Sequence, residues 1–258
     1  EIALWDILGK MSGLPVYKLL GGAHHSSIRG YASLPPYPTP EEAAEDAAAQ
    51  AGDGYHMVKL HQRDLASVAA TRKAIGDNVE LALDVNGCWS RREAVTMAQR
   101  MEEYSLRWLE EPVSPMDDYD GLSFIRERSN ISIAAGENEY THYGFKTLIE
   151  KNAVDILQPD VIKAGGLSCC RKILGMAEAW NIPLITHSFY YGAGVAATAH
   201  FVISNPFGNE MEICTTPIEE NFISPDFRPV HGKITVSDAP GLGIDVNEDV
   251  VKHYRIDI

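Results

Sequence analysis

The chain has 258 residues, of which 45% are hydrophobic, and its 22 basic and 36 acidic side chains give a formal net charge of −14. This length suits one large domain, and a negative chain does not attract nucleic acid or an anionic membrane surface, so neither is expected as a partner. The four cysteines lack C-x-x-C spacing, and the sequence has no run of 18 apolar residues and no leader pattern, which predicts a cytoplasmic protein with reduced thiols.

Two short helical pieces are predicted between Ile2 and Leu20, and after them strands and helices alternate. Short apolar runs bounded by turn residues predict eight strands, at 28–34, 56–61, 81–84, 108–110, 131–137, 154–160, 182–187 and 209–214. Helical periodicity predicts the helices at 43–51, 65–75, 94–104, 145–151, 167–180 and 195–203. This alternation predicts an α/β fold, a (β/α)7β TIM-type barrel over residues 1–230.

Two of the predicted helices have capping boxes at their start. Thr39 is followed three residues later by Glu42, and Ser90 is followed three residues later by Glu93. In such a box each side chain satisfies a free backbone N–H of the first helical turn. Pro40 adds a residue that suits the first position of a helix.

Residues 231–258 depart from the alternating pattern. The stretches 232–236 and 240–244 predict short irregular strands with turns. Such strands suit packing on a neighbouring domain better than closing a barrel. The chain also starts inside a predicted helix, so we expect a preceding domain to be missing from it.

Three consecutive predicted strands end in an acidic residue. Asp84, Glu110 and Glu137 are 26 positions (84 to 110) and 27 positions (110 to 137) apart, about the length of one strand-plus-helix unit. Because the carboxyl ends of barrel strands meet at one mouth, these carboxylates should converge, and they would repel each other without a cation. A ligand set made of oxygen atoms suits Mg²⁺ better than Zn²⁺.

Polar residues also stand at the other predicted strand ends. Lys59 and His61 are two positions apart on one strand and therefore face the same side. Asp160, His187 and Glu212 follow at the ends of the last three strands. One such residue would be unremarkable, but polar residues at the ends of consecutive strands predict a catalytic site. Glu111 is expected to be the structural member of its pair with Glu110.

As a set, these motifs resemble the enolase superfamily and, within it, the mandelate racemase subgroup. The resemblance is carried by Asp84-Val85-Asn86, Trp108-Leu109-Glu110-Glu111-Pro112, Gly136-Glu137-Asn138, Pro159-Asp160-Val161-Ile162-Lys163-Ala164-Gly165-Gly166, and His187. It differs in two respects: His61 stands where mandelate racemase has lysine, and the family's N-terminal α+β capping domain is absent from this chain. In the family, loops of that domain close over the substrate, and the segment 231–258 is expected to pack against it.

The resemblance also implies roles for individual residues. Mg²⁺ would bind Asp84, Glu110 and Glu137, and Lys59 and His61 would form the region of the base. Asp160 and His187 would form a dyad on the opposite face, and Glu212 would be a hydrogen-bonding acid. A small carboxylate substrate would bind near Lys59 and Asn86. A homo-oligomer is also expected.

The predicted reaction begins with removal of a proton alpha to a carboxylate. Its product carries two negative charges on one small group, so a metal and a cation such as Lys59 must stabilise it. His187 can exchange a proton near neutral pH, and Asp160 can fix its tautomer. We predict dehydration of a sugar acid to a 2-keto-3-deoxy acid, in which His187 or His61 helps the β-hydroxyl group to leave.

Three alternatives to a dehydratase stay open at this point. A racemase or epimerase would use two bases that exchange the proton. A barrel that binds a phosphorylated ligand would use the glycines of Gly165-Gly166 or Gly192-Ala193-Gly194, since many barrels bind phosphate at such turns. A non-catalytic subunit would explain the missing cap but would not explain the polar residues at consecutive strand ends.

Overall fold

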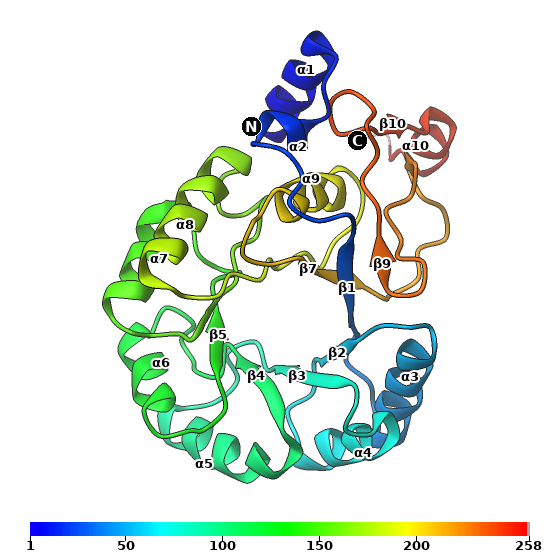
Figure 1. Cartoon of the computed structure of the whole chain (residues 1–258). Helices are drawn as coiled ribbons and strands as arrows, with labels where there is room; N and C mark the ends of the chain where they lie inside the picture. The colour runs from blue at the N-terminus through cyan, green and yellow to red at the C-terminus, as the bar shows by residue number, and fades with distance from the viewer. Residues whose placement is uncertain (257–258) are drawn as a thin grey trace.

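The wall of the molecule is a ring of parallel strands surrounded by helices (Figure 1). In this computed structural model, which describes residues 1–256, seven parallel strands follow the order β6-β5-β4-β3-β2-β1-β7 around the wall. They are β1 (Ile28–Ser33), β2 (Met57–Leu60), β3 (Glu80–Asp84), β4 (Leu106–Glu110), β5 (Ile133–Ala135), β6 (Ile156–Leu157) and β7 (Glu210–Cys214). The predicted (β/α) barrel is confirmed.

The place between β6 and β7 is filled by residues 184–187. Isolated bridges join Leu184 to Leu157 and Thr186 to Met211, so the ring closes through this stretch. The prediction of a regular strand at 182–187 is therefore wrong. Pro183 has no backbone N–H to donate, and the bridges on the two sides of the stretch do not extend into a ladder.

Helices cover the outside of the barrel (Figure 1). They are α1 (Ile2–Ser12), α2 (Val16–Leu19), α3 (Pro40–Gly52), α4 (Leu65–Ile75), α5 (Arg91–Met101), α6 (Tyr119–Arg126), α7 (Thr141–Glu150), α8 (Leu167–Trp180) and α9 (Ala193–Ile203). Both predicted capping boxes form, at Thr39 and Ser90. The helix predicted at 94–104 is α5 followed by a 3₁₀ turn (Glu102–Tyr104), and α6 was not predicted because only eight residues carry its amphipathic pattern.

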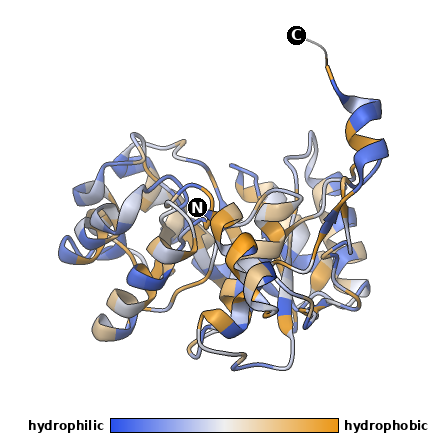
Figure 2. Ribbon diagram, turned by 90° about the horizontal axis from the view of Figure 1, so that it is seen from above, coloured by the Kyte–Doolittle hydropathy of each residue, from blue (hydrophilic) through white to orange (hydrophobic). Residues whose placement is uncertain are grey.

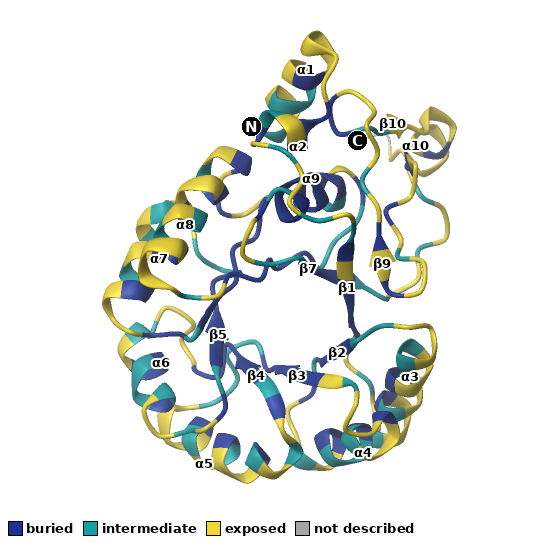
Figure 3. Cartoon of the chain, viewed as in Figure 1, coloured by how far each residue is buried: buried dark blue, intermediate teal, exposed yellow. Residues whose placement is uncertain are grey.

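Two apolar regions hold the barrel together. The larger one lies between the strands and the inner faces of the helices, whose outer faces are exposed (Figure 3). The smaller one fills the inside of the ring and consists of Tyr31, Met57, Ala82, Trp108, Ala134, Ile156 and Ile185. Because side chains alternate along each strand, both regions can be built from the same strands. The inner cluster forms the floor beneath the mouth.

An ion-pair cluster lies at the amino ends of the strands, at the opposite end of the barrel from the mouth. Arg107 contacts Glu210 through both terminal nitrogens, at 3.0 and 2.6 Å, and contacts Glu80 at 2.8 Å. Nε2 of His56 lies 3.0 Å from Oε1 of Glu210. Burial works to raise the pKa of Glu210, but the hydrogen bonds from His56 and Arg107 outweigh it and lower this pKa to about 2.

The last part of the chain packs partly on its own barrel. It contains β8 (Ile223–Ser224), β9 (Lys233–Ile234), β10 (Asp245–Val246) and α10 (Glu248–Tyr254). As predicted, 232–236 contains a short strand, but 240–244 does not, since β10 follows it and pairs with β8. β9 pairs antiparallel with β1, while α10, next to the C-terminal end in Figure 2, projects away from the barrel. Packing of residues 231–258 on a capping domain stays a prediction.

None of the helices within residues 1–256 is both long enough and apolar enough to cross a membrane.

Candidate active site

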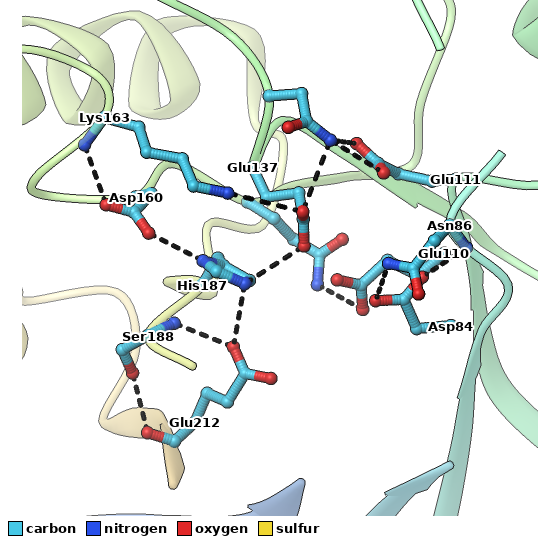
Figure 4. A network of polar contacts seen from close by, with 12 residues as sticks. Asp84, Asn86, Glu110, Glu111, Glu137, Asp160, Lys163, His187, Ser188 and Glu212 are labelled. Atoms are coloured by element: carbon cyan, nitrogen blue, oxygen red, sulfur yellow. Dashed lines mark hydrogen bonds and ion pairs between the residues drawn. The ribbon is translucent and has the colours of Figure 1, made fainter. Parts of the chain in front are cut away.

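Three buried carboxylates converge at the mouth, from the ends of β3, β4 and β5 (Figure 4). Asp84 and Glu110 are register partners on neighbouring strands, and Glu137 stands just beyond β5. One oxygen from each lies within 4.8 Å of the others. Gly136 turns the chain before Glu137 with φ of 138°, and a Cβ at this position would lie 2.8 Å from the ring of Phe145. The three predicted acids are therefore brought together in one group.

Lys59 lies beneath this group and is fully buried. Its Nζ is 2.9 Å from Oε1 of Glu110, 2.8 Å from Oε1 of Glu212 and 3.7 Å from Oδ2 of Asp84. Burial opposes the charge of Lys59, but the neighbouring carboxylates raise its pKa well above the ordinary value, so it is an ammonium ion. One ammonium does not balance the carboxylates around it. Burial raises the pKa of Glu110 to about 7, although Lys59 opposes the rise.

Glu110 is held from the floor of the barrel. Its Oε2 accepts hydrogen bonds from Nε1 of Trp108 and from Nε2 of Gln158, both at 2.9 Å. Both donors are fully buried. The carboxylate is therefore fixed through one oxygen, and Oε1 faces Lys59.

His61 contacts the group from the side of β2. Its Nδ1 lies 2.6 Å from the backbone oxygen of Leu34, which can only accept, so Nδ1 carries a proton and Nε2 is directed at Oδ2 of Asp84, 3.2 Å away. Burial opposes protonation of this ring, but the contact with Asp84 outweighs it and raises the pKa of His61. The predicted substrate-binding residue Asn86 also contacts Asp84, through its backbone N at 2.8 Å and its Nδ2 at 3.1 Å.

His187 contacts the group from the stretch between β6 and β7. Nδ1 lies 2.7 Å from Oδ2 of Asp160, while Nε2 lies 3.0 Å from Oε2 of Glu137 and 3.9 Å from Oε2 of Glu212 (Figure 4). Burial opposes protonation, but Glu212, Asp160 and Glu137 raise the pKa of His187 to about 10. Oε2 of Glu212 also accepts a hydrogen bond from the backbone N of Ser188 at 2.7 Å. The two histidines thus stand at two ends of one carboxylate group.

A cavity of about 470 Å³ is lined by Ser188, Glu212 and Cys214 among others, and one of about 740 Å³ opens directly on the carboxylates. The larger cavity is lined by His61, Asp84, Asn86, Glu137 and His187 among others. Its volume lies within the size range of small-molecule sites, which is roughly 300–1,000 Å³. Four of these residues were predicted as catalytic or metal-binding, and the fifth, Asn86, was predicted to bind substrate.

Several residues that support the site were missed. Trp108 and Gln158 each stand two positions before a predicted site residue, Glu110 and Asp160, so strand alternation could have found them. Asn138 donates to both carboxylate oxygens of the buried Glu111, at 3.0 Å each. Burial, together with Glu137 and Asp84, raises the pKa of Glu111 to about 8.

The phosphate alternative finds no support at Gly165-Gly166. These glycines precede α8, and the free N–H groups of Leu167 and Ser168 already donate to the carboxylate of Glu1, at 2.8 and 3.0 Å. A phosphate would meet a negative charge there. Near the other glycine pair, a Cβ on Gly192 would lie 2.2 Å from the ring of Phe222, so this glycine is required by packing.

The fold and the site define a (β/α) barrel with an acidic, histidine-flanked centre at its mouth. The family model described as "Enolase C-terminal domain-like" matches residues 41–250, and the chain belongs to this family. Its relatives and structural neighbours include mandelate racemase and muconate lactonizing enzyme-like proteins of the enolase superfamily, which confirms the resemblance seen in the sequence.

Similar proteins with a named activity include sugar-acid dehydratases and a cycloisomerase. The chain is 32% identical to D-galactarolactone cycloisomerase of Agrobacterium fabrum, over 99% of this chain and 72% of the relative. It is 32% identical to D-galactonate dehydratase of Ralstonia nicotianae, over 96% of this chain and 70% of the relative.

The fold is shared with solved structures of similar sequence. The 3,6-anhydro-D-galactonate cycloisomerase from Zobellia galactanivorans superposes with a TM-score of 0.92 and 37% identity, covering 99% of this chain and 74% of that one. A mandelate racemase/muconate lactonizing enzyme-like protein from Roseovarius sp. TM1035 gives a TM-score of 0.91 and 33% identity, covering 98% and 70%. The chain is thus similar both to dehydratases and to cycloisomerases.

Proposed function

We propose that this barrel removes a proton alpha to the carboxylate of a sugar acid, with the help of Mg²⁺, and dehydrates the acid to a 2-keto-3-deoxy acid. One observation carries the proposal: the buried carboxylates of Asp84, Glu110 and Glu137 have oxygens within 4.8 Å of one another, between two imidazoles. The named dehydratases among the relatives support the choice of substrate class.

The residues at the mouth fit Mg²⁺. Asp84, Glu110 and Glu137 offer only oxygen, which hard divalent cations prefer. Burial and, after it, the neighbouring carboxylates raise the pKa of Glu110, although the ammonium of Lys59 opposes the rise. These three carboxylates would hold the ion, and a bound ion would supply positive charge next to the substrate carboxylate as negative charge develops there.

The chain's own side chains supply the proton transfers. Lys59 is held as an ammonium ion and adds positive charge under the reacting carboxylate. His61 lines the mouth cavity whereas Lys59 is fully buried, so we assign proton removal from the alpha carbon to Nε2 of His61 in its neutral form, with the proton on Nδ1. Nε2 of His187 then gives a proton to the β-hydroxyl group as the carbon–oxygen bond breaks. Water leaves, and the resulting enol becomes the keto acid.

An isomerase is the second candidate, and one observation favours it. His61 and His187 contact the carboxylate group from two sides, as a reaction with two exchanging bases requires. The cycloisomerases among the similar proteins also agree with it. Both candidates share the first step. In either case a small carboxylate is the ligand, and assembly into a homo-oligomer stays a prediction.

The test of the metal site is an equilibrium Mg²⁺ titration of the parent and of Glu110→Gln. We expect the variant to lose Mg²⁺ binding and turnover while its fold survives. Glu80→Gln is the matched control, because Glu80 pairs with Arg107 in the ion-pair cluster at the opposite end of the barrel. If Glu110→Gln binds Mg²⁺ as tightly as the parent, the assignment is wrong.

A further inference from the structure

We infer that Arg63 recognises a second anionic group at the far end of the substrate, and that the site therefore selects dicarboxylic sugar acids over sugar acids that end in a hydroxymethyl group. This inference rests on the proposed function, because it takes the reacting carboxylate to bind beside Asp84, Glu110 and Glu137.

Lys59 lies on β2, and His61 and Arg63 follow in the segment that leaves this strand. Their exposure increases outward: Lys59 is fully buried, His61 is half-buried and Arg63 is exposed. Arg63 and His61 both line the 740 Å³ cavity, so Arg63 stands at its rim, above the proposed base.

The charge of Arg63 is not used inside the protein. Among residues 1–256 it has neither a hydrogen bond nor an ion pair. The neighbouring carboxylate of Asp64 is committed to the start of α4, where it accepts from the backbone N and the Oγ of Ser67, both at 2.8 Å. Lys163, the other lysine or arginine that lines the cavity, contacts Glu137 at 3.5 Å. Of these two side chains, Arg63 is therefore the one whose charge is free to bind a ligand.

Its surroundings fit a carboxylate. The guanidinium lies close enough to Cys88, just beyond β3, to oppose the rise in the pKa of that thiol that burial causes. Asp84 and Asn86, at the end of β3, line the same cavity as Arg63. A guanidinium binds a carboxylate through two parallel hydrogen bonds, whereas a hydroxymethyl group can accept only weakly. If Arg63 only contributed to solubility, its substitution would not change the preference between substrates that differ at the far end.

The test compares acids that differ only at that end. Hexaric and hexonic acids of matched configuration, for example D-galactarate and D-galactonate, are assayed with Mg²⁺ for keto-acid formation and for exchange of the alpha hydrogen in D₂O. The parent should prefer the diacid. In Arg63→Met, the ratio of kcat/KM for diacid to that for monoacid should fall about 10- to 100-fold, with the loss carried by the diacid. Arg63→Lys should recover part of it.

Arg92→Met is the matched control, because Arg92 is an exposed arginine on α5 that does not line the cavity. It should keep the parent's ratio. An unchanged ratio in Arg63→Met, an equal loss for both acids, or a parent that prefers the monoacid would each overturn the inference.

Calorimetric binding separates this inference from the proposed function. If the parent turns over neither acid but binds the diacid, and Arg63→Met weakens that binding, the role of Arg63 stands and the proposed reaction falls. If the parent turns over sugar acids without regard to their far end, the reaction stands and the role of Arg63 falls. A parent that neither binds nor converts either acid overturns both.

Discussion

Nδ1 of His187 lies 2.7 Å from Oδ2 of Asp160, and the other oxygen of Asp160 accepts from the backbone N of Ile162 and of Lys163, at 2.7 and 2.8 Å. A carboxylate with these donors is held in one orientation as an acceptor. Nδ1 of His187 must therefore carry a proton, and Nε2 is the atom directed at the mouth. This relationship fixes the tautomer of the histidine to which we assign delivery of a proton to the leaving group.

Removal of His187 should separate the two steps of the proposed reaction. His187→Asn should still exchange the alpha hydrogen with D₂O, because His61 remains, while keto-acid formation should fall by about 10²- to 10⁴-fold. Proton NMR in D₂O and a keto-acid assay measure the two steps on the same sample.

His61→Asn is the partner of this experiment. Its exchange should be lost together with dehydration, since the proposed base is gone. The opposite pattern, with exchange lost in His187→Asn and kept in His61→Asn, would make His187 the base.

Substitution of Gln158, which is not one of the predicted metal ligands, should weaken Mg²⁺ binding. Gln158→Met removes one of the two donors that hold Oε2 of Glu110 and keeps the size of the side chain. Loss of such a supporting hydrogen bond lowers metal affinity by about 10- to 100-fold, and we expect this reduction for Mg²⁺ in an equilibrium titration.

Gln62→Met provides the same chemical change elsewhere. Gln62 is buried at the mouth and donates to the backbone oxygen of Tyr37, away from the carboxylate group. Its Mg²⁺ affinity should equal that of the parent. Equal affinity in Gln158→Met as well would show that Trp108 alone holds Glu110.

The ion-pair cluster at the far end of the barrel should affect stability but not metal binding. Glu210→Gln should lower the free energy of unfolding by about 1–3 kcal/mol at pH 7, since Arg107 and His56 lose their charged partner. The folded pKa of Glu210 is about 2, below its ordinary value of 4.5, so its stabilisation is present above pH 4.5 and is lost as the pH falls towards 2.

Urea unfolding at several pH values checks this prediction. The difference between parent and Glu210→Gln should shrink as the pH falls below 4.5, and Mg²⁺ affinity at pH 7 should stay the same. Equal stability of the two proteins at pH 7 would contradict it.

His200 should make the free energy of unfolding rise with pH between about pH 4 and pH 6.5, a higher range than that of Glu210. It is fully buried, its Nδ1 accepts from the backbone N of Tyr17, and its Nε2 lies 3.1 Å from the backbone oxygen of Leu242. Burial lowers its pKa from 6.5 to about 4, so between these values the unfolded chain binds more protons than the folded one. About 3 kcal/mol of stability should be lost between pH 7 and pH 4 through this residue.

His200→Gln isolates this contribution, because other groups titrate in both proteins. The pH dependence of the free energy of unfolding between pH 4 and pH 6.5 should be shallower in the variant than in the parent. The same slope in both would show that His200 does not titrate in this range.

The sequence predicts well what depends on local pattern. One acid near each strand end, at a regular spacing, was enough to bring Asp84, Glu110 and Glu137 together, because the βα unit repeats and parallel strands end at one mouth. What depends on contacts between distant residues was not predicted. The carboxylate of Glu1 at the start of α8 joins positions 1 and 167, and no local signal contains that contact. The position of His61 against Asp84 likewise depends on how β2 and β3 pair.

The stretch 184–187, which ends with His187, is held in the wall by isolated bridges instead of a ladder. Local opening of a protein begins where backbone hydrogen bonds are few, so the amide hydrogens of this stretch should exchange with solvent earlier than those of β3 or β4. His187, the proposed acid, would then lie in a part of the barrel wall that opens more readily than β3 or β4. This local motion would let the imidazole follow the hydroxyl group as it departs, while the carboxylates on the other strands keep their positions.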